Sequence, residues 1–379
     1  MKVDIIGAGI CGLTTAIALE KRGFQPRIYE QAKTLKPVGA GIILASNAMQ
    51  VYRNLGLEEQ LNSNGIPLSA LNITNDKLKV ISKVDLNYFR DKYNLQSIAI
   101  HRGKLQEVLL DNLKQTEIHP DHQLKDLTKE KEGYQLKYEN GKSVNSSLLL
   151  GADGIHSKVR AALFPNSKIR NMKQLCWRGV TEFKLPSIYK SELNEIWGRG
   201  DRFAFVQFSE DKIYWYAVKS FEKSENEFSS DKLSLYFEKY PPIVQEIIKA
   251  TAFDTIHVTV MEDLEPIKKW HDEFACLMGD AAHATTPNMG QGACQSIEDA
   301  YTLADCLANQ SDSRAFAAYQ KLRMSKAHQV VNQSWQIGKI SHWKNPIGIA
   351  FRNSILKIIP EKLNLVQLEK LFQLERKVS

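Results

Sequence analysis

The amino-acid sequence predicts an α/β fold: parallel strands and helices form one unit, a mostly antiparallel β-sheet is inserted into it, and helices end the chain. The chain opens on a buried strand, a glycine-rich turn and a helix, which is the pattern of a β-α-β unit. From about residue 170 the segments become aromatic and alternating, which is typical of antiparallel strands. A strand, a glycine loop and a helix return near residue 275, so we expect the first unit to be discontinuous in sequence.

The composition is that of an ordinary globular protein. The 379 residues are 43% hydrophobic and 25% charged, and the net charge of +7 is spread along the chain. No basic run carries interleaved aromatic residues, so we expect no nucleic-acid partner. No apolar run approaches the ~20 residues that span a bilayer, and we expect no signal peptide before the first strand. Five cysteines without a C-x-x-C pair predict neither disulfides nor a metal site, which favours a cytoplasmic location.

The first strand, turn and helix carry the motif of a dinucleotide site. Gly7, Gly9 and Gly12 form a complete G-x-G-x-x-G after the strand-like segment VDII. The first glycine permits a tight turn, the second lets the backbone approach a pyrophosphate, and the third lets the helix pack on the strand. Glu30 ends the second predicted strand, QPRIYE, where its carboxylate can accept hydrogen bonds from ribose hydroxyls. This motif alone does not separate NAD from FAD.

The segments between the motifs alternate between helical and strand-like patterns. Residues 47–61 are predicted to be helical, and residues 66–86 are richer in strand formers. An amphipathic helix is predicted over 101–115 and a buried strand over 148–154. Residues 331–379 are predicted to form helices that are interrupted at Pro346 and Pro360.

Two later motifs favour FAD over NAD. The segment GADGIHSKVR places Asp153 at the end of one strand, and LMGDAAHATTPNMGQGACQSIEDA places Asp280 at the end of another. Asp280 can accept a hydrogen bond from a polyol hydroxyl, and the ribityl chain of FAD offers such hydroxyls whereas NAD does not. The amides of residues 290–294 begin a helix and form a positive concavity, which suits negative charge on the ring of a reduced flavin.

The three motifs, in this order and spacing, resemble the dinucleotide fingerprint, the DG motif and the GD motif of the single-component FAD-dependent aromatic hydroxylases, the p-hydroxybenzoate hydroxylase fold class. The resemblance covers nearly the whole chain. KPVGAGI, WRGV, GRGDRF and HATTPNMGQGACQSIEDA look closest to the branch that includes urate hydroxylase, salicylate hydroxylase-like enzymes and zeaxanthin epoxidase.

The patterns and the resemblance together imply a Rossmann-like FAD-binding domain with an inserted substrate domain. We assign residues 1–75, 101–168 and 266–330 to the discontinuous FAD-binding domain. Residues 76–100 and 169–265 are assigned to a mostly antiparallel sheet domain that binds the substrate, and 331–379 to C-terminal helices.

The resemblance also implies which residues bind FAD, and that the FAD is not covalently attached. Glu30 and Gln31 match positions at the adenosine ribose, Arg102 matches an arginine near the pyrophosphate, and Leu124 matches a backbone contact to the adenine. The loop from Pro287 onward matches the segment against the isoalloxazine ring. The complete predicted set is Gly7, Gly9, Cys11, Gly12, Glu30, Gln31, Ile43, Arg102, Leu124, Asp153, Asp280, Pro287, Gly290, Gln291, Gly292, Ala293 and Cys294.

The reaction implied by the resemblance is that of an NAD(P)H- and O2-dependent flavin monooxygenase. NADH or NADPH would bind transiently and reduce FAD, and a flavin C4a-hydroperoxide would transfer one oxygen atom to a small aromatic or heteroaromatic substrate. Only one G-x-G-x-x-G occurs, so we expect no second domain that holds NADPH permanently. The protein is expected to supply positioning, a dry cavity and charge stabilisation.

The candidate substrate residues lie in the aromatic segments. The resemblance places Arg202 of GRGDRF opposite the flavin and Tyr214 of IYWYAV in the pocket wall, and both are catalytic candidates. Arg178, Tyr216 and Phe205 are the candidate substrate-binding residues. An arginine and a tyrosine can hold an anionic or phenolic substrate in its electron-rich form. The alternative for Arg202 is a surface or turn arginine.

Several alternatives stay open at this point. Arg178 stands where urate hydroxylase has a substrate-binding asparagine, which argues against urate as the substrate. A larger ligand could instead undergo polyene epoxidation or antibiotic inactivation, and the chain could be an NAD(P)H oxidase or an FAD-dependent sensor. His283 could be a general base or a structural residue, and Cys294 could offer a reactive thiol or only its amide. The sequence does not determine the substrate, the choice between NADH and NADPH, or the choice between monomer and homodimer.

Overall fold

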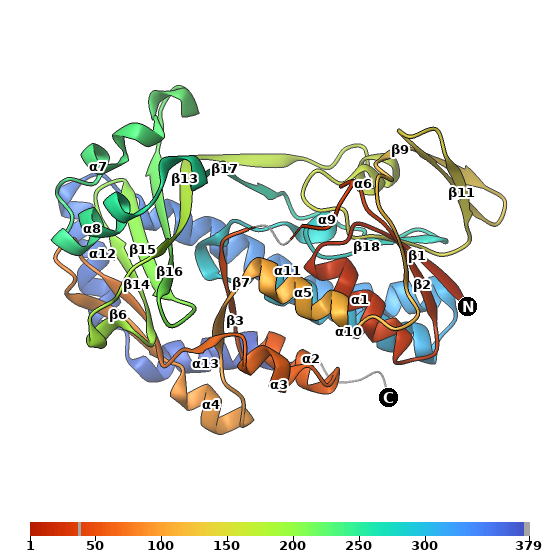
Figure 1. Ribbon diagram of the computed structural model, residues 1–379, viewed down its shortest axis with the longest axis horizontal. Coiled ribbons are helices and arrows are strands. Elements are labelled where there is room, and N and C mark those ends of the chain that lie inside the picture. Colours follow the sequence, from red (N-terminus) through yellow and green to blue (C-terminus); the bar gives the residue numbers. More distant parts are fainter. Residues whose placement is uncertain (37–38, 375–379) are drawn as a thin grey trace.

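The computed structural model describes residues 1–36 and 39–374, and two β-sheets of different kinds dominate it (Figure 1). A parallel sheet lies at the end of the molecule that holds the N-terminus, and a larger, mostly antiparallel sheet lies at the other end. This arrangement, with helices at the end of the chain, confirms the predicted fold class. Residues 37–38 of the segment KPVGAGI and residues 375–379 of the predicted C-terminal helices lie outside the described residues.

The parallel sheet has five strands in the order β18-β12-β1-β2-β8, and every neighbouring pair is parallel. Because β1, β12 and β18 are neighbours, segments far apart in the sequence end side by side at the carboxyl edge of one sheet. Ligands of open α/β sheets bind at this edge. The strands are β1 (Lys2–Ile6), β2 (Gln25–Tyr29), β8 (Glu117–His119), β12 (Leu149–Gly151) and β18 (Ala275–Leu277).

The helix α1 (Ile10–Glu20) is buried along its whole length except for Glu20. It packs against β2 and against the helices α5 (Arg102–Asp111) and α10 (Gly292–Asn309), which explains why its sequence is apolar on every side. The chain leaves the helix through Gly23, whose φ of +81° is in the left-handed region, and enters β2.

The second large sheet has seven strands in the order β17-β13-β16-β15-β14-β5-β6. Every neighbouring pair is antiparallel except β14 and β5, which are parallel. The strand β5 lies in this sheet although we assigned residues up to 75 to the FAD-binding domain, and the domain boundaries stay a prediction. The strands are β5 (Ala70–Thr74), β6 (Val80–Asp85), β13 (Ile169–Glu182), β14 (Glu192–Trp197), β15 (Asp201–Gln207), β16 (Lys212–Ser220) and β17 (His257–Leu264).

The two faces of the seven-stranded sheet have different neighbours, because successive side chains along a strand point to opposite faces. One face carries Phe203 and Trp215, which pack in an aromatic cluster with Phe237 and with the helix α8 (Pro242–Ala250). The other face carries Tyr214, which lies so close to Gly41 that a Cβ added there would be 2.5 Å from the Cβ of Tyr214. This second face therefore turns toward the FAD-binding part of the chain.

Two smaller antiparallel sheets and several short helices complete the part before residue 290. The predicted helix over 47–61 is divided into α2 and α3, because Gly56 takes a φ of +73° between them. One small sheet consists of β3 (Gly41–Leu44), β7 (Ile98–His101) and β4 (Ile66–Pro67), and the other of β9 (Leu124–Glu130), β10 (Gly133–Tyr138) and β11 (Ser143–Ser146). The short helices are α2 (Ser46–Asn54), α3 (Glu58–Asn62), α4 (Asn87–Tyr93), α6 (Lys158–Leu163), α7 (Leu233–Tyr236), α9 (Asp280–His283) and the 3-10 turn η5 (Pro287–Met289).

The C-terminal part is helical, as predicted. The helix α11 (Asp312–Ser341) is followed by α12 (Pro346–Ile358) and α13 (Glu361–Phe372). Pro346 begins α12 and Pro360 comes directly before α13, positions where the missing N–H of proline costs no helical hydrogen bond. Within residues 1–36 and 39–374, no helix combines the length and the apolar character needed to cross a membrane.

Candidate active site

The three glycine and aspartate motifs converge at the carboxyl edge of the parallel sheet. Gly7 follows β1, Asp153 follows β12, and Asp280 follows β18. Backbone hydrogen bonds hold the three strand ends in register: the Ala152 amide donates to the Ile6 carbonyl at 2.9 Å, and the Met278 amide donates to the Gly151 carbonyl at 3.0 Å. The structure therefore brings together three motifs that the sequence separates by more than a hundred residues each.

The first glycine turn has no room for side chains at Gly7 and Gly12, whereas the space beside Gly9 is open. Gly7 has a φ of +104°, and a Cβ there would lie 2.6 Å from the Ala152 carbonyl oxygen. A Cβ on Gly12 would lie 2.0 Å from the Gly7 carbonyl oxygen. The helix α1 that follows starts at Gly9 without a side-chain cap, and α10 also starts without one. Two uncapped helix N-termini, with their free N–H groups, fit the phosphates and the carbonyl edge of a bound FAD.

The predicted adenosine end of the site is arranged around Glu30. Its carboxylate accepts hydrogen bonds from the Ala8 amide at 2.7 Å and from the Ala32 amide at 2.8 Å, which fixes the carboxylate beside the glycine turn. Gln31 is exposed next to it. Leu124 is buried at the start of β9, so only its backbone is in a position to serve a ligand.

Asp280 and Arg102 form the predicted phosphate and ribityl part of the site. Asp280 is exposed, but the surrounding protein reduces its solvation and raises its pKa; the charges of His283 and Arg102 act in the opposite direction. Arg102 is exposed, and its guanidinium forms no ion pair within the described residues, so it fits a pyrophosphate. Ile43 lies next to this region on β3.

Within the described part of the chain, the Asp153 carboxylate, unlike that of Asp280, is held by hydrogen bonds from neighbouring residues. Its carboxylate accepts hydrogen bonds from the Ser157 hydroxyl at 2.6 Å and from the Lys158 amide at 2.7 Å, so it fixes the start of α6. Arg160 of the same helix donates to the Ala281 carbonyl at 3.1 Å, and this bond ties the DG segment to the GD segment. Burial raises the pKa of Asp153, and these hydrogen bonds partly offset the rise.

The predicted flavin loop begins at Pro287 and turns through Gly290, whose φ is +63°, into α10. The amides of Gly292, Ala293 and Cys294 are in the first turn of this helix, where the helix itself offers them no acceptor. The Gln291 side chain does not point to a ligand, because its Oε1 accepts a hydrogen bond from Asn47 Nδ2 at 3.0 Å.

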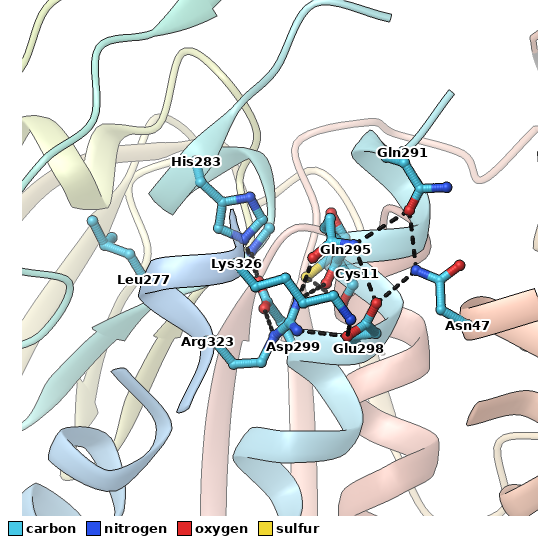
Figure 2. Close-up of polar contacts among 12 residues, drawn as sticks. Cys11, Asn47, Leu277, His283, Gln291, Gln295, Glu298, Asp299, Arg323 and Lys326 are labelled. Carbon is cyan, nitrogen blue, oxygen red and sulfur yellow. Dashed lines mark hydrogen bonds and ion pairs between the residues drawn. The ribbon is translucent and has the colours of Figure 1, made fainter. Parts of the chain in front are cut away.

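A buried network of charged side chains supports the flavin loop from inside the protein (Figure 2). Glu298 accepts hydrogen bonds from Arg323 at 2.6 Å, from Lys326 at 2.8 Å and from Asn47 at 2.6 Å. Asp299 accepts from Arg323 Nε at 2.8 Å. Burial opposes the ionisation of Asp299, but the charges of His283 and Arg323 outweigh it and lower the pKa. Sequence reasoning missed this network, and its signal in the sequence is the adjacent acidic pair 298–299.

His283 and Cys294, the two other residues considered for catalysis, are buried in the protein. His283 is buried, and its Nε2 lies 2.5 Å from Asp299 Oδ2, so the structural alternative for His283 is favoured. Cys294 is buried beside the Ile43 carbonyl, and burial raises the pKa of its thiol to about 12. Burial also raises the pKa of the Cys11 thiol well above its ordinary value. Neither cysteine is a thiolate at neutral pH, which favours a role for the Cys294 amide.

Arg202 lies on the sheet face toward the FAD-binding part, and its donors are used inside the protein. It is 2% exposed, which does not fit a surface arginine. Its guanidinium donates to Glu195 Oε1 at 2.8 Å, to Asn288 Oδ1 at 2.6 Å and to His342 Nε2 at 3.0 Å. Asn288 belongs to the flavin loop and His342 follows α11, so Arg202 connects the sheet to both.

Arg178, Tyr214 and Tyr216 lie together on the same face and are only half-buried. Arg178 is paired with Tyr216 across β13 and β16, and the Tyr214 and Tyr216 rings have centroids 6.0 Å apart. Burial raises the pKa of both tyrosines, so both are neutral at physiological pH. Within residues 1–36 and 39–374, the Arg178 guanidinium forms no ion pair with a carboxylate.

Phe205 is not brought together with the other candidate substrate residues. It is fully buried on the opposite face of the sheet, where its ring meets the edge of Tyr189 at 5.5 Å between centroids. Strict alternation along β15 is the reason, because Arg202, Ala204 and Val206 take one face and Phe203 and Phe205 take the other. The predicted role of Phe205 as a substrate contact therefore does not fit its position.

Comparisons with known proteins agree with this geometry. A family model described as FAD binding domain matches residues 1–334. The chain is 32% identical over 362 residues to aurachin C monooxygenase/isomerase of Stigmatella aurantiaca, and the match covers 95% of this chain and 94% of that protein. It is 30% identical over 370 residues to 2-heptyl-3-hydroxy-4(1H)-quinolone synthase of Pseudomonas aeruginosa, with 95% and 94% covered.

The same architecture occurs in a solved structure. HpxO of Klebsiella pneumoniae, complexed with FAD and uric acid, superposes with a TM-score of 0.89 at 23% identity, covering 98% of this chain and 96% of that one. This structural similarity shows the fold. The family match and the two relatives show the class of activity. The uncapped helix ends, the crowded glycine turn and the unpaired Arg102 fit FAD. The chain therefore belongs to the FAD binding domain family and is a single-component FAD-dependent monooxygenase of the aromatic hydroxylase class.

Proposed function

We propose that this monooxygenase uses NADH or NADPH and O2 to add one oxygen atom to a heteroaromatic substrate of the quinolone type. The observation that carries the proposal is the half-buried Arg178 without a carboxylate partner in the described residues, beside two neutral tyrosines. Such a guanidinium suits a ligand oxygen that carries partial or full negative charge. A quinolone has such an oxygen at its ring carbonyl, and one relative is named for a hydroxylated quinolone.

Arg178 is the residue that would activate this substrate. A guanidinium that donates to the ring carbonyl oxygen favours the form in which negative charge collects on that oxygen. The ring carbon beside the carbonyl is then electron-rich and becomes the carbon that accepts oxygen. Tyr214 and Tyr216, which remain protonated, would orient the ring by hydrogen bonding and ring contact and would not act as phenolate bases.

The bound cofactor supplies the remaining chemistry: reduced FAD activates O2 for transfer to the substrate. Arg102 and the N-terminus of α1 are proposed to hold the phosphates, and Asp280 a ribityl hydroxyl. The N-terminus of α10 would stabilise negative charge at the carbonyl edge of the ring. Arg202 is proposed as a positioning residue, which acts on the flavin loop through Asn288 and does not itself touch the substrate.

The experiment uses 2-heptyl-4(1H)-quinolone, which lacks one oxygen atom relative to the compound in the relative's name, with uric acid as the comparator. NADH or NADPH oxidation, H2O2 and product mass are measured together on the FAD-loaded protein. We expect the quinolone, and not uric acid, to accelerate oxidation and to gain one oxygen atom. Steady NAD(P)H consumption that ends only in H2O2 with both compounds would support the alternative of an NAD(P)H oxidase. A product formed only from a bulky polyene or antibiotic would support the larger-ligand alternative.

A further inference from the structure

The outer face of α12 exposes large apolar side chains. Ile347 is 81% exposed, Phe351 61%, Ile355 42% and Ile358 77%. Successive residues of a helix are about 100° apart, so these four side chains fall within an arc of about 80°. A surface helix of a globular protein normally turns its polar side to solvent. In α12 the apolar side faces outward, and we call these four residues the α12 face.

The opposite side of α12 is firmly attached to the protein. Arg352 is buried, its Nη1 donates to the Ser341 carbonyl at 2.9 Å, and its guanidinium lies 5.2 Å from the centre of the Trp197 ring. The helix also packs against β6 at the edge of the seven-stranded sheet. Figure 1 shows α12 at the end of the molecule farthest from the N-terminus. The α12 face is thus a fixed feature of the surface and is available to a partner.

The basic side chains near α12 indicate which kind of partner would bind there. From residue 339 to residue 360, which covers α12 and the segment leading into it, the sequence contains four lysines and arginines and no aspartate or glutamate. Three of them, Lys339, Lys344 and Lys357, are exposed, and Lys344 also pairs with the exposed Glu222 at 2.8 Å. An apolar helix face bordered by basic residues is the composition of helices that lie in the interface of a membrane with anionic lipids.

We propose that α12 docks this enzyme on an anionic lipid surface, with its axis in the plane of the membrane and the α12 face in contact with the acyl chains. The exposed Lys339, Lys344 and Lys357 then lie near the lipid phosphates. A second copy of the chain suits this surface less well, because two copies would bring the exposed lysines near two such faces against each other. The inference goes beyond the proposed function and holds for any substrate of the enzyme.

The test is flotation of the FAD-loaded full chain with vesicles of phosphatidylcholine, with and without phosphatidylglycerol. We expect binding to the anionic vesicles, and weaker binding at high salt because salt screens the lysines. The double variant Phe351→Gln/Ile358→Gln should reduce the vesicle-bound to free ratio by about tenfold or more, since it removes two apolar contacts. The matched control is Ile188→Gln/Phe253→Gln, which changes two residues of comparable exposure outside α12 and should bind like the wild type.

Measurements on the same protein preparations include the results that would overturn the proposal. FAD content and far-UV circular dichroism establish that each variant is folded. Absence of binding to anionic vesicles, or equal binding by the α12 variant and the wild type, would overturn it. Light scattering that finds a dimer in the wild type and a monomer in the α12 variant would assign the face to a second copy and also overturn it. Turnover of a water-soluble substrate should be the same in all variants, so failure of vesicle binding is distinguishable from failure of the proposed function.

Discussion

Two arginines on one face of the seven-stranded sheet have opposite surroundings. Around Arg202 the protein supplies an acceptor for each guanidinium nitrogen: Glu195, Asn288 and His342. Around Arg178 the neighbours are the Cys176 side chain and two neutral tyrosines, and no carboxylate pairs with it in the described ranges 1–36 and 39–374. Burying a charge is costly unless it is paired, so a saturated arginine holds the structure together whereas an unsaturated one is left for a ligand.

The difference reverses the order of importance suggested by the sequence. Arg202 belongs to the motif GRGDRF and was the first catalytic candidate, with a surface or turn position as the alternative. Its environment supports a third role, in which it fixes the flavin loop through Asn288. Arg178 was only a substrate-binding candidate, and its environment makes it the residue best placed to meet a substrate oxygen.

The largest expected effect is the loss of stability in Arg202→Met. Removing one partner of a buried ion pair leaves Glu195 without its cation, and such changes cost about 3–5 kcal/mol. Urea unfolding of the FAD-loaded protein measures this. The double variant Arg202→Met/Glu195→Met removes both charges and should recover part of the loss. If Arg202→Met unfolds like the wild type and loses only turnover, Arg202 is a catalytic residue and the comparison of the two arginines is wrong.

The second expected effect is a loss of activity at Arg178, in contrast to the loss of stability at Arg202. Arg178→Met should lower substrate-dependent turnover by about a hundredfold, which corresponds to about 2.7 kcal/mol in the barrier, because it removes a charged hydrogen bond to the substrate. FAD content and unfolding midpoint should stay unchanged, since the substitution breaks no ion pair among residues 1–36 and 39–374. Arg178→Lys, which keeps the charge but not the planar donor pair, should retain part of the activity. Full activity in Arg178→Met would move the substrate site elsewhere.

A third change tests cofactor binding apart from both arginines. Asp280→Asn replaces a charge-assisted hydrogen bond with a neutral one, and we expect the FAD dissociation constant to rise about ten- to a hundredfold, or roughly 1.5–3 kcal/mol. Flavin fluorescence during titration of the apoprotein measures this constant. Asp254→Asn, at an exposed aspartate of another segment, is the control and should bind FAD normally. Equal affinity in both variants would remove Asp280 from the cofactor site.

The smallest effect is a pH dependence that arises in the Arg202 region. His342 Nε2 accepts a hydrogen bond from Arg202, and burial together with the charge of Arg202 lowers the pKa of His342 well below its ordinary value. The unfolded chain binds a proton near pH 6.5 and the folded chain does not, so stability is lost as the pH falls below about 6.5. The slope for one histidine is at most about 1.4 kcal/mol per pH unit.

The measurement for this prediction is the free energy of unfolding at several pH values in the wild type and in His342→Gln. His328, with its pKa lowered to about 4, contributes a slope of the same sign in both proteins. The wild type should therefore lose stability in acid more steeply than the variant. Parallel pH curves for the two proteins would show that folding does not lower the pKa of His342.

Local patterns were sufficient to determine the nucleotide half of the protein. Gly7 and Gly12 of the first turn are required because side chains there would collide with the backbone. Strand-end aspartates such as Asp153 and Asp280 follow buried strands, and the carboxyl ends of parallel strands meet at one edge. Period-two alternation along β15 is also enough to put Arg202 and Phe205 on opposite faces, although it does not say which face the substrate would meet.

Only the tertiary structure decided which charged groups meet. Glu298 and Asp299 find their cations on α11, and Arg202 finds His342 across 140 positions of sequence. No periodicity encodes such a pairing, because it depends on how separate elements pack. For the same reason the sequence did not distinguish Arg202 from Arg178: both are arginines in aromatic strands, and the number of acceptors within reach of each is set by the neighbouring helices and loops.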